Sequence, residues 1–423
     1  MLALAGRLFF LFMFRDQLAV DTDAYLAHAE TLLERGGYFK PGTEIPTAFR
    51  PPLLPLFYAG ILWLGGGVWA IGFLQVLLGT ATVWYGGRTA ENLTNQDVGF
   101  ATAIFIAGNP ILIYSQCTLM TETLFTFLLA YLFFRASLLK STSPLRDYFL
   151  LGCIGGLLAL CRPGIWPFYG LMLIGTVLLG LKAGAFRKAI MRTAVVASGL
   201  LLVVSPWVLR NTLVMGSPIV MTTHGGYTLL LGNNDAFYDE VVRQPWGTTW
   251  QEESLLAWQA RLEEEMVRDL GAELARLEIP RDRWMKEQAY SWIKQHPGKF
   301  VEASWLRVRR FWAISPTVAP QWTDLFGRGI GMFYLLLYAI AACGIYMWFK
   351  HGRNFIPQFY VVLSLLFCVT SFFLVHTVYW SNMRMRAPVD VCLAILASAL
   401  YLWDRSETLS DQGIDVVEKP EKE

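Results

Sequence analysis

The sequence predicts an all-α protein that crosses a membrane many times. Of its 423 residues, 55% are hydrophobic and only 16% are charged, whereas soluble proteins carry about 25% charged residues. Several apolar runs approach the ~20 residues that a helix needs to cross the hydrocarbon core of a bilayer. The net charge of +2 gives no indication of a nucleic-acid-binding surface.

The apolar segments predict about ten spans. The expected spans are residues 1–18, 68–87, 99–117, 122–139, 148–161, 164–181, 194–209, 329–349, 356–375 and 388–403. We interpret the first as a retained span rather than a signal peptide, because no small-residue cleavage site follows it. Arg7 inside this span is costly, by about 2.5–3.5 kcal/mol at a helix centre. Residues 52–66 are apolar but short and rich in proline, which predicts an interfacial helix.

The basic residues of the short connections predict the orientation. Alternate connections carry Arg88, Lys140, Arg146, Lys182, Arg187, Lys188, Arg192, Lys350 and Arg353. By the positive-inside rule these connections face the cytoplasm, as do both termini. An N-terminal transmembrane module, residues 1–209, then holds a first extracytoplasmic loop at 19–67. A long extracytoplasmic segment at 210–328, C-terminal helices at 329–403 and a disordered cytoplasmic tail at 404–423 follow.

The long segment is expected to be mostly helical and amphipathic. Apolar residues recur at helical spacing, among them Trp258, Trp292 and Trp305. Tryptophan-rich helices with basic flanks suit a membrane interface. A small subdomain with its own core explains the pattern equally well, and the two interpretations are compatible.

Two acidic residues stand where the first span ends. Asp21 or Asp23 could cap a helix that begins near residue 24. The Asp-x-Asp pattern also occurs as a metal-binding signature of soluble nucleotide-sugar transferases. No predicted strand precedes it here, so metal binding is the weaker interpretation.

The six cysteines fit neither a metal site nor a disulfide framework, and we expect them to be buried apolar residues.

Further charged residues gather at the same predicted membrane face. They are Arg50, Glu122, Arg162, Arg210, His376, Arg384 and Arg386. Guanidinium groups match the oxygens of phosphate in a fork, which indicates an anion site. The alternatives are contacts with ordinary anionic lipid headgroups for the arginines and a favourable helix N-terminal charge for Glu122.

The order of several motifs carries a resemblance. These motifs are Asp21-Thr22-Asp23-Ala24-Tyr25, Arg50-Pro51-Pro52-Leu53-Leu54-Pro55, Asn109-Pro110 to Thr121-Glu122, Cys161-Arg162-Pro163, Trp207-Val208-Leu209-Arg210-Asn211 and Arg384-Met385-Arg386-Ala387-Pro388. In this order they resemble the GT-C glycosyltransferases related to dolichyl-phosphate-mannose protein O-mannosyltransferases and to lipid A aminoarabinose transferases. The resemblance covers roughly residues 1–215 and 370–400. The chain has fewer expected spans than the best-studied relatives and no counterpart of their extended C-terminal domain.

The resemblance implies a GT-C-like helical bundle and a polyprenyl-phosphate sugar as donor. It implies that Asp21 is the catalytic base, with Asp23 in reserve as a cap or helper and Glu122 as a second acidic position. Arg50 takes the place of a basic residue near the donor phosphate. The Arg-x-Arg pair, Arg384 and Arg386, suggests the same role.

The sequence therefore predicts an inverting glycosyltransferase. It would move a sugar from a polyprenyl phosphate to an acceptor hydroxyl on protein, lipid or glycan, in contact with membrane lipids and without nucleic acid. No cofactor is assigned, and a divalent cation is not expected. We expect the protein in a bacterial inner membrane, with its site facing away from the cytoplasm.

A transporter or flippase of lipid-linked glycans is the main alternative. The spans of a transporter should hold more ionisable residues than the spans of this chain do. A non-catalytic scaffold would not explain the converging arginines.

Overall fold

Helices account for the whole regular structure of the part of the chain that can be described. The computed structural model describes residues 1–316, 324–351 and 356–400. Within these ranges the only pairing of extended backbone is an isolated bridge between Phe39 and Pro46. The predicted cytoplasmic tail at 404–423 and the end of the last expected span lie outside the described residues.

Five helical segments of the described ranges are long and apolar enough to cross a membrane. They are α4 (Val68–Leu93), the 3₁₀-plus-α9 segment Pro163–Lys182, α10 (Phe186–Met215), α17 (Asp324–His351) and α18 (Ile356–Val378). Each coincides with an expected span. Together they confirm a polytopic, all-helical architecture.

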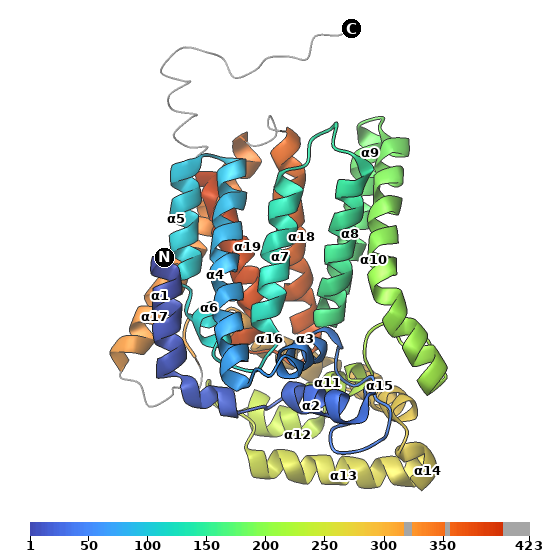
Figure 1. Ribbon diagram of the computed structural model, residues 1–423. Helices are drawn as coiled ribbons and strands as arrows, with labels where there is room; N and C mark the ends of the chain where they lie inside the picture. Colours follow the sequence, from blue (N-terminus) through green and yellow to red (C-terminus); the bar gives the residue numbers. More distant parts are fainter. Residues whose placement is uncertain (317–323, 352–355, 401–423) are drawn as a thin grey trace, which may run out of the picture.

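The other five expected spans correspond to shorter helices. They are α1 (Leu2–Met13) with the 3₁₀ turn Arg15–Ala19, α5 (Gln96–Ala107) with α6 (Pro110–Ser115), α7 (Glu122–Ser137), α8 (Leu145–Cys161) and α19 (Ala387–Ala397). In Figure 1, α5, α7, α8 and α19 run alongside the long helices. By length alone they do not qualify as spans, so ten spans remains a prediction.

The polar segments collect at one end of this bundle. Figure 1 shows α2 (Tyr25–Arg35) and α3 (Leu53–Trp63) there, beside the helices of the long segment. Those are α11 (Gly225–Leu231), α12 (Asp235–Phe237), a π-turn at Tyr238–Val242, α13 (Glu252–Leu270), α14 (Ala272–Ala275), α15 (Glu278–Gln295) and α16 (Pro297–Phe311). These helices share a hydrophobic core around Trp258 and Trp284 that is separate from the core of the bundle. We call this region the polar end.

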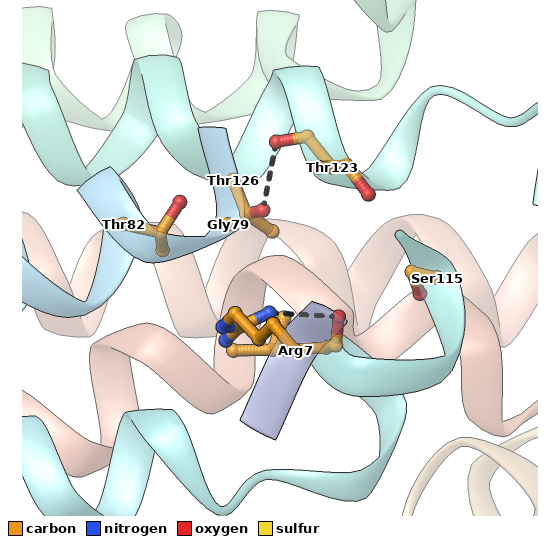
Figure 2. A pocket seen from close by; sticks show the side chains of 7 residues that line it. Arg7, Gly79, Thr82, Ser115, Thr123 and Thr126 are labelled. Carbon is orange, nitrogen blue, oxygen red and sulfur yellow. Dashed lines mark hydrogen bonds between the residues drawn. The ribbon is translucent and has the colours of Figure 1, made fainter. Parts of the chain in front are cut away.

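Arg7 is accommodated in α1 by a polar network inside the bundle. Its Nη1 atom donates to Gln116 Oε1 at 2.7 Å, and its guanidinium lies 3.4–3.5 Å from the carbonyl oxygens of Leu112 and Ile106. Those carbonyls lie on both sides of the break between α5 and α6. Figure 2 shows Arg7 beside Gly79, in a small hollow that threonine and serine side chains also line. The network offsets the unfavourable burial of the Arg7 charge, and it gives hydrogen-bond partners to backbone carbonyls at the break between α5 and α6.

Glycines bring α8 and α10 into close contact. A Cβ atom on Gly152 would come within 2.0 Å of the carbonyl oxygen of Val196, and one on Gly199 within 2.2 Å of that of Phe149. Gly156, one turn after Gly152, would likewise meet Val203 at 2.6 Å. This is the small-residue packing typical of membrane helices. It matters for function because α8 ends directly before Arg162.

Replacing Gly152 with valine should therefore separate α8 from α10 and destabilise the protein. We expect a loss of about 1–3 kcal/mol or more, because the clash is with backbone rather than with a movable side chain. The melting temperature in detergent would fall by several degrees. Gly170→Val in α9 is the matched control, since nothing lies within 4 Å of a Cβ atom there. Equal melting temperatures for the two variants would contradict this account of the packing.

Candidate active site

The first loop enters α2 through a tight turn formed by residues 21–24. The N–H of Ala24 donates to the carbonyl of Asp21 at 3.0 Å, and Ala24 adopts a left-handed conformation with φ of 58°. The Oδ2 atom of Asp21 accepts a hydrogen bond from the N–H of Ala27 at 2.9 Å. Asp21 thus caps the first turn of α2. Its Oδ1 atom is buried and has no hydrogen-bond partner among the described residues.

Asp23 leaves the same turn in another direction and meets two arginines. Its Oδ1 atom lies 2.9 Å from Arg50 Nη2, and its Oδ2 atom lies 3.7 Å from Arg384 Nη2. The sequence favoured Asp23 as the cap or helper. In the structure, the capping contact is made by Asp21, and Asp23 joins the first loop to the residues before the last helix.

Glu122 lies at the N-terminus of α7 with a side chain that is only 2% exposed. Its Oε1 atom is 3.2 Å from Arg384 Nε and 3.6 Å from Arg162 Nη1. Its Oε2 atom is buried without a hydrogen-bond partner in the described part of the chain. Glu122 therefore shares Arg384 with Asp23 and adds Arg162 to the same group.

These contacts join five side chains in one line: Arg50, Asp23, Arg384, Glu122 and Arg162. We call them the charge cluster. Three guanidinium groups against two carboxylates leave a net charge of +1. Five charges from four separate parts of the chain thus meet where the helical bundle adjoins the polar end.

The surroundings hold these charges in place. The nearby carboxylate of Glu122 is the main cause that raises the pKa of Arg384 despite its burial. The guanidinium of Arg50 lies 5.4 Å from the ring centre of Tyr25 and 5.3 Å from that of Phe49. Contacts of this kind favour a cation over an aromatic face. Arg384 and Arg50 thus have carboxylate or aromatic partners, and a small anion could replace part of the pairing between the arginines and the carboxylates.

Arg386 does not join the cluster, although the sequence grouped it with Arg384. Its side chain is fully buried and donates to Asp390 Oδ1 at 2.8 Å and to the carbonyls of Phe311 and Ala313 at 2.7 and 2.9 Å. Its Nε and Nη1 groups are thus occupied by protein atoms. Arg386 fixes the 3₁₀ turn Met383–Arg386 against the end of α16, and this turn carries Arg384.

Arg210 is also occupied away from the cluster. Its Nη1 atom donates to the carbonyl of Thr47 at 2.8 Å, and Nη2 donates to the carbonyl of Tyr38. Glu278 of α15 completes this clasp, because it accepts hydrogen bonds from the hydroxyl of Thr47 and, at 3.0 Å, from the N–H of Ala48. Arg210 and Glu278 thereby hold the segment that leads into Arg50.

His376, near the end of α18, contacts residues that hold this helix end in place. Its Nδ1 atom is 3.1 Å from the carbonyl oxygen of Trp380, and its ring stacks on Phe311 at 5.5 Å. Arg307 fixes the same helix end by donating to the carbonyls of Thr377 and Val378, both at 2.7 Å. No ion pair or hydrogen bond in the described residues joins His376 to the charge cluster.

The arrangement of Asp21, Asp23 and Glu122 does not suit a metal ion. Among the described residues no three His, Cys, Asp or Glu side chains are grouped as a metal site. Asp21 faces the backbone of α2 while Asp23 faces Arg50, so the Asp-x-Asp pair does not present its oxygens to one point. Guanidinium groups occupy the space around Asp23 and Glu122, and they would repel a cation.

Sequence reasoning missed three residues that position the cluster: Asp390, Glu278 and Arg307. Asp390 had a usable signal, since a carboxylate within the apolar run of α19 is unusual and needs a partner. Glu278 had none, because acidic residues are common in the first turn of a helix. Arg307 was one of several arginines in an amphipathic helix, and only the fold shows which of them is buried.

Comparison with known proteins agrees with this architecture. Residues 49–209 match the family model of dolichyl-phosphate-mannose-protein mannosyltransferase. The structure resembles the archaeal oligosaccharyltransferase AglB from Archaeoglobus fulgidus, solved with an inhibitory peptide and a dolichol-phosphate, with a TM-score of 0.53 and 13% identity over 99% of this chain. The chain covers 52% of that protein and so spans about half of its length.

A second structure, ArnT from Cupriavidus metallidurans bound to undecaprenyl phosphate, gives a TM-score of 0.44 at 12% identity, covering 97% of this chain and 78% of that one. A comparison with curated proteins gave no match. The match over residues 49–209 includes Arg50, Glu122 and Arg162 of the charge cluster. The chain thus shares a family match over residues 49–209 with the dolichyl-phosphate-mannose-protein mannosyltransferases and a helical fold with the archaeal structure.

Proposed function

We propose that the protein is an inverting glycosyltransferase with a polyprenyl-phosphate sugar as donor and a hydroxyl group as acceptor. The acceptor belongs to a protein, a lipid or a glycan. The observation that carries the proposal is the charge cluster, with its net charge of +1, at the junction of an apolar bundle and a polar end. A lipid-linked phosphate needs both an apolar environment for its tail and cations for its headgroup.

Arg50, Arg162 and Arg384 would bind the phosphate of the donor. During transfer the bond between the anomeric carbon and the phosphate oxygen breaks, and the leaving polyprenyl phosphate gains negative charge. Guanidinium groups fixed in a partly buried site stabilise that charge without reorganising. The family match and the dolichol-phosphate in the similar archaeal structure favour the same class of donor. Arg210 and Arg386 would act indirectly, by holding the first loop and the turn before α19.

Asp21 is the base that the geometry favours. One of its oxygens is fixed by the N–H of Ala27, and the other is buried and free to accept a proton. Asp23 has both oxygens engaged by guanidinium groups, so neither is left for the acceptor hydroxyl. Glu122 keeps one free oxygen and would assist. The acceptor oxygen would bond to the anomeric carbon as its proton passes to Asp21, and a single displacement of this kind inverts the anomeric centre.

The rival transporter function is less consistent with the interior of the bundle. A transporter would need ionisable residues that can load and release a substrate or a proton within the spans. Arg7 is bonded to Gln116, and Asp390 is bonded to Arg386 and Asn109. These groups connect helices, whereas the five charges of the cluster lie together at one end. We place that end on the extracytoplasmic face of a bacterial inner membrane.

Replacing Asp21 with asparagine should abolish most of the transfer while preserving the fold. Asparagine can still accept the capping hydrogen bond from Ala27 but cannot take the proton. We expect a loss of about 10²–10⁴-fold in rate, with the melting temperature unchanged. The measurement is transfer of radiolabelled sugar from a panel of polyprenyl-phosphate sugars to membranes of a deletion strain.

Asp23→Asn is the matched control for Asp21→Asn, because it removes a carboxylate from the same turn. Its main effect should be on the apparent KM for the donor, since it frees Arg50 from its carboxylate partner and leaves Arg384 with Glu122 alone. Full activity of a folded Asp21→Asn protein would remove Asp21 as the base. Movement of lipid-linked sugar across proteoliposomes without any transfer would instead support the transporter.

Changing the net charge of the cluster should shift phosphate binding in opposite directions. Arg384→Gln lowers the net charge from +1 to zero, and we expect it to weaken binding of polyprenyl phosphate by about tenfold or more. Glu122→Gln raises the charge to +2 and should strengthen that binding while lowering the rate of transfer. Titration of the purified protein with polyprenyl phosphate measures both effects.

Arg309→Gln is the control for the charge variants, because Arg309 is exposed and packs on Trp246 outside the cluster. It should bind polyprenyl phosphate like the wild type. If Glu122→Gln and Arg384→Gln weaken binding equally, the cluster does not act through its net charge.

A further inference from the structure

Tyr58 is a buried residue of the site that none of the preceding roles uses. It lies in α3, eight residues after Arg50, and its side chain is fully buried. Its hydroxyl has no hydrogen-bond partner among the described residues. Burying a hydroxyl without a partner is unfavourable, and most buried polar groups in proteins are satisfied. An unsatisfied hydroxyl therefore needs an explanation.

The surroundings of Tyr58 provide one. Burial raises the pKa of its phenol, and the negative charges of Asp21 and Glu122 raise it further. The hydroxyl thus stays protonated as a donor. Helix α3, which carries it, packs against α2, whose first turn is capped by Asp21, and against α8. Cys161, the last residue of α8, has its Sγ atom 3.9 Å from the carbonyl oxygen of Thr121, the residue before Glu122.

The unsatisfied atoms around Tyr58 are complementary in type. Tyr58 offers an unused O–H donor, while Asp21 Oδ1 and Glu122 Oε2 are buried acceptors without partners. These groups do not bond to one another. A hydroxyl group placed among them could accept from Tyr58 and donate to a carboxylate at the same time, because a hydroxyl is both donor and acceptor.

We propose that Tyr58 binds the acceptor substrate, by donating a hydrogen bond to the oxygen of the hydroxyl that attacks the sugar. This assignment rests on the proposed function and extends it to the acceptor side. The contact would point the proton of that hydroxyl toward Asp21 Oδ1 and leave a lone pair of its oxygen for the anomeric carbon. Tyr58 keeps its own proton throughout. The acceptor proton passes to Asp21, and the polyprenyl phosphate leaves with the bonding electron pair.

The assignment separates Tyr58 from the donor side of the site. The phosphate would be held by the charge cluster, whereas Tyr58 would act only when an acceptor is present. A residue with a purely structural role would instead be needed for stability. Tyr58→Phe distinguishes these roles, because it keeps the ring and removes only the hydroxyl.

The experiment compares the wild type with Tyr58→Phe and Tyr338→Phe. The hydroxyl of Tyr338 is also buried without a hydrogen-bond partner among the described residues, but Tyr338 belongs to α17 and packs against Arg386, which is not part of the charge cluster. Three quantities are measured for each purified protein. They are the melting temperature, the binding of polyprenyl phosphate, and the sugar transfer from a polyprenyl-phosphate sugar while the amount of deletion-strain membrane is varied.

For Tyr58→Phe we expect transfer at low acceptor to fall about tenfold, with polyprenyl phosphate binding within twofold of wild type and no loss of thermal stability. Tyr338→Phe should match the wild type in all three. Wild-type transfer by Tyr58→Phe would overturn the assignment, as would an equal loss of polyprenyl phosphate binding or a lowered melting temperature. If the wild type transfers no sugar, the proposed function fails and this assignment fails with it; the other outcomes overturn the assignment alone.

Discussion

The pairing of charges at the end of an apolar bundle is the constraint on which the site depends. A charge removed from water is stable only with a partner, and Glu122 has a side chain that is 2% exposed. It is held by Arg162 and Arg384, and Arg384 in turn meets Asp23, which is bound by Arg50. Loss of Asp23 would leave Arg50 without its carboxylate partner, and loss of Glu122 would do the same to Arg162. The first loop, α7, the end of α8 and the turn before α19 are therefore fixed relative to one another by the groups that would meet a phosphate.

The break between α5 and α6 also helps to position the charge cluster. The break at residues 108–109 exposes carbonyls that Arg7 approaches, and it frees Asn109 to bond to Asp390. Asp390 holds Arg386, and Arg386 fixes the turn that presents Arg384. A continuous helix would place none of these side chains in this way. Charged residues inside the bundle thus support the site from a distance instead of forming a pathway through it.

Much of this fold could be predicted from the sequence because its strongest signals are local. Long apolar runs identified α4, α10, α17 and α18, and the proline-rich run after Arg50 predicted the short helix α3, whose interfacial position stays a prediction. All five cluster residues could be assigned to one predicted membrane face from the order of spans and connections. Their partners could not be predicted, since Arg384 and Arg386 are two residues apart in the same motif yet face different surroundings. Local sequence does not encode which of the two arginines will donate its hydrogen bonds to distant backbone carbonyls.

The two acids of the first turn show why such details matter for chemistry. Asp21 and Asp23 are separated by one residue, and either could have capped α2. Because the backbone of α2 takes one oxygen of Asp21, this carboxylate is oriented without being neutralised by an arginine. Because Asp23 pairs with Arg50 and Arg384, these cations are oriented without forming an ion pair with Asp21, the proposed base. A general base must be free to accept a proton, and a phosphate site must hold its cations still. Under the proposed function one residue could not meet both needs, and the tight turn of residues 21–24 divides them between Asp21 and Asp23.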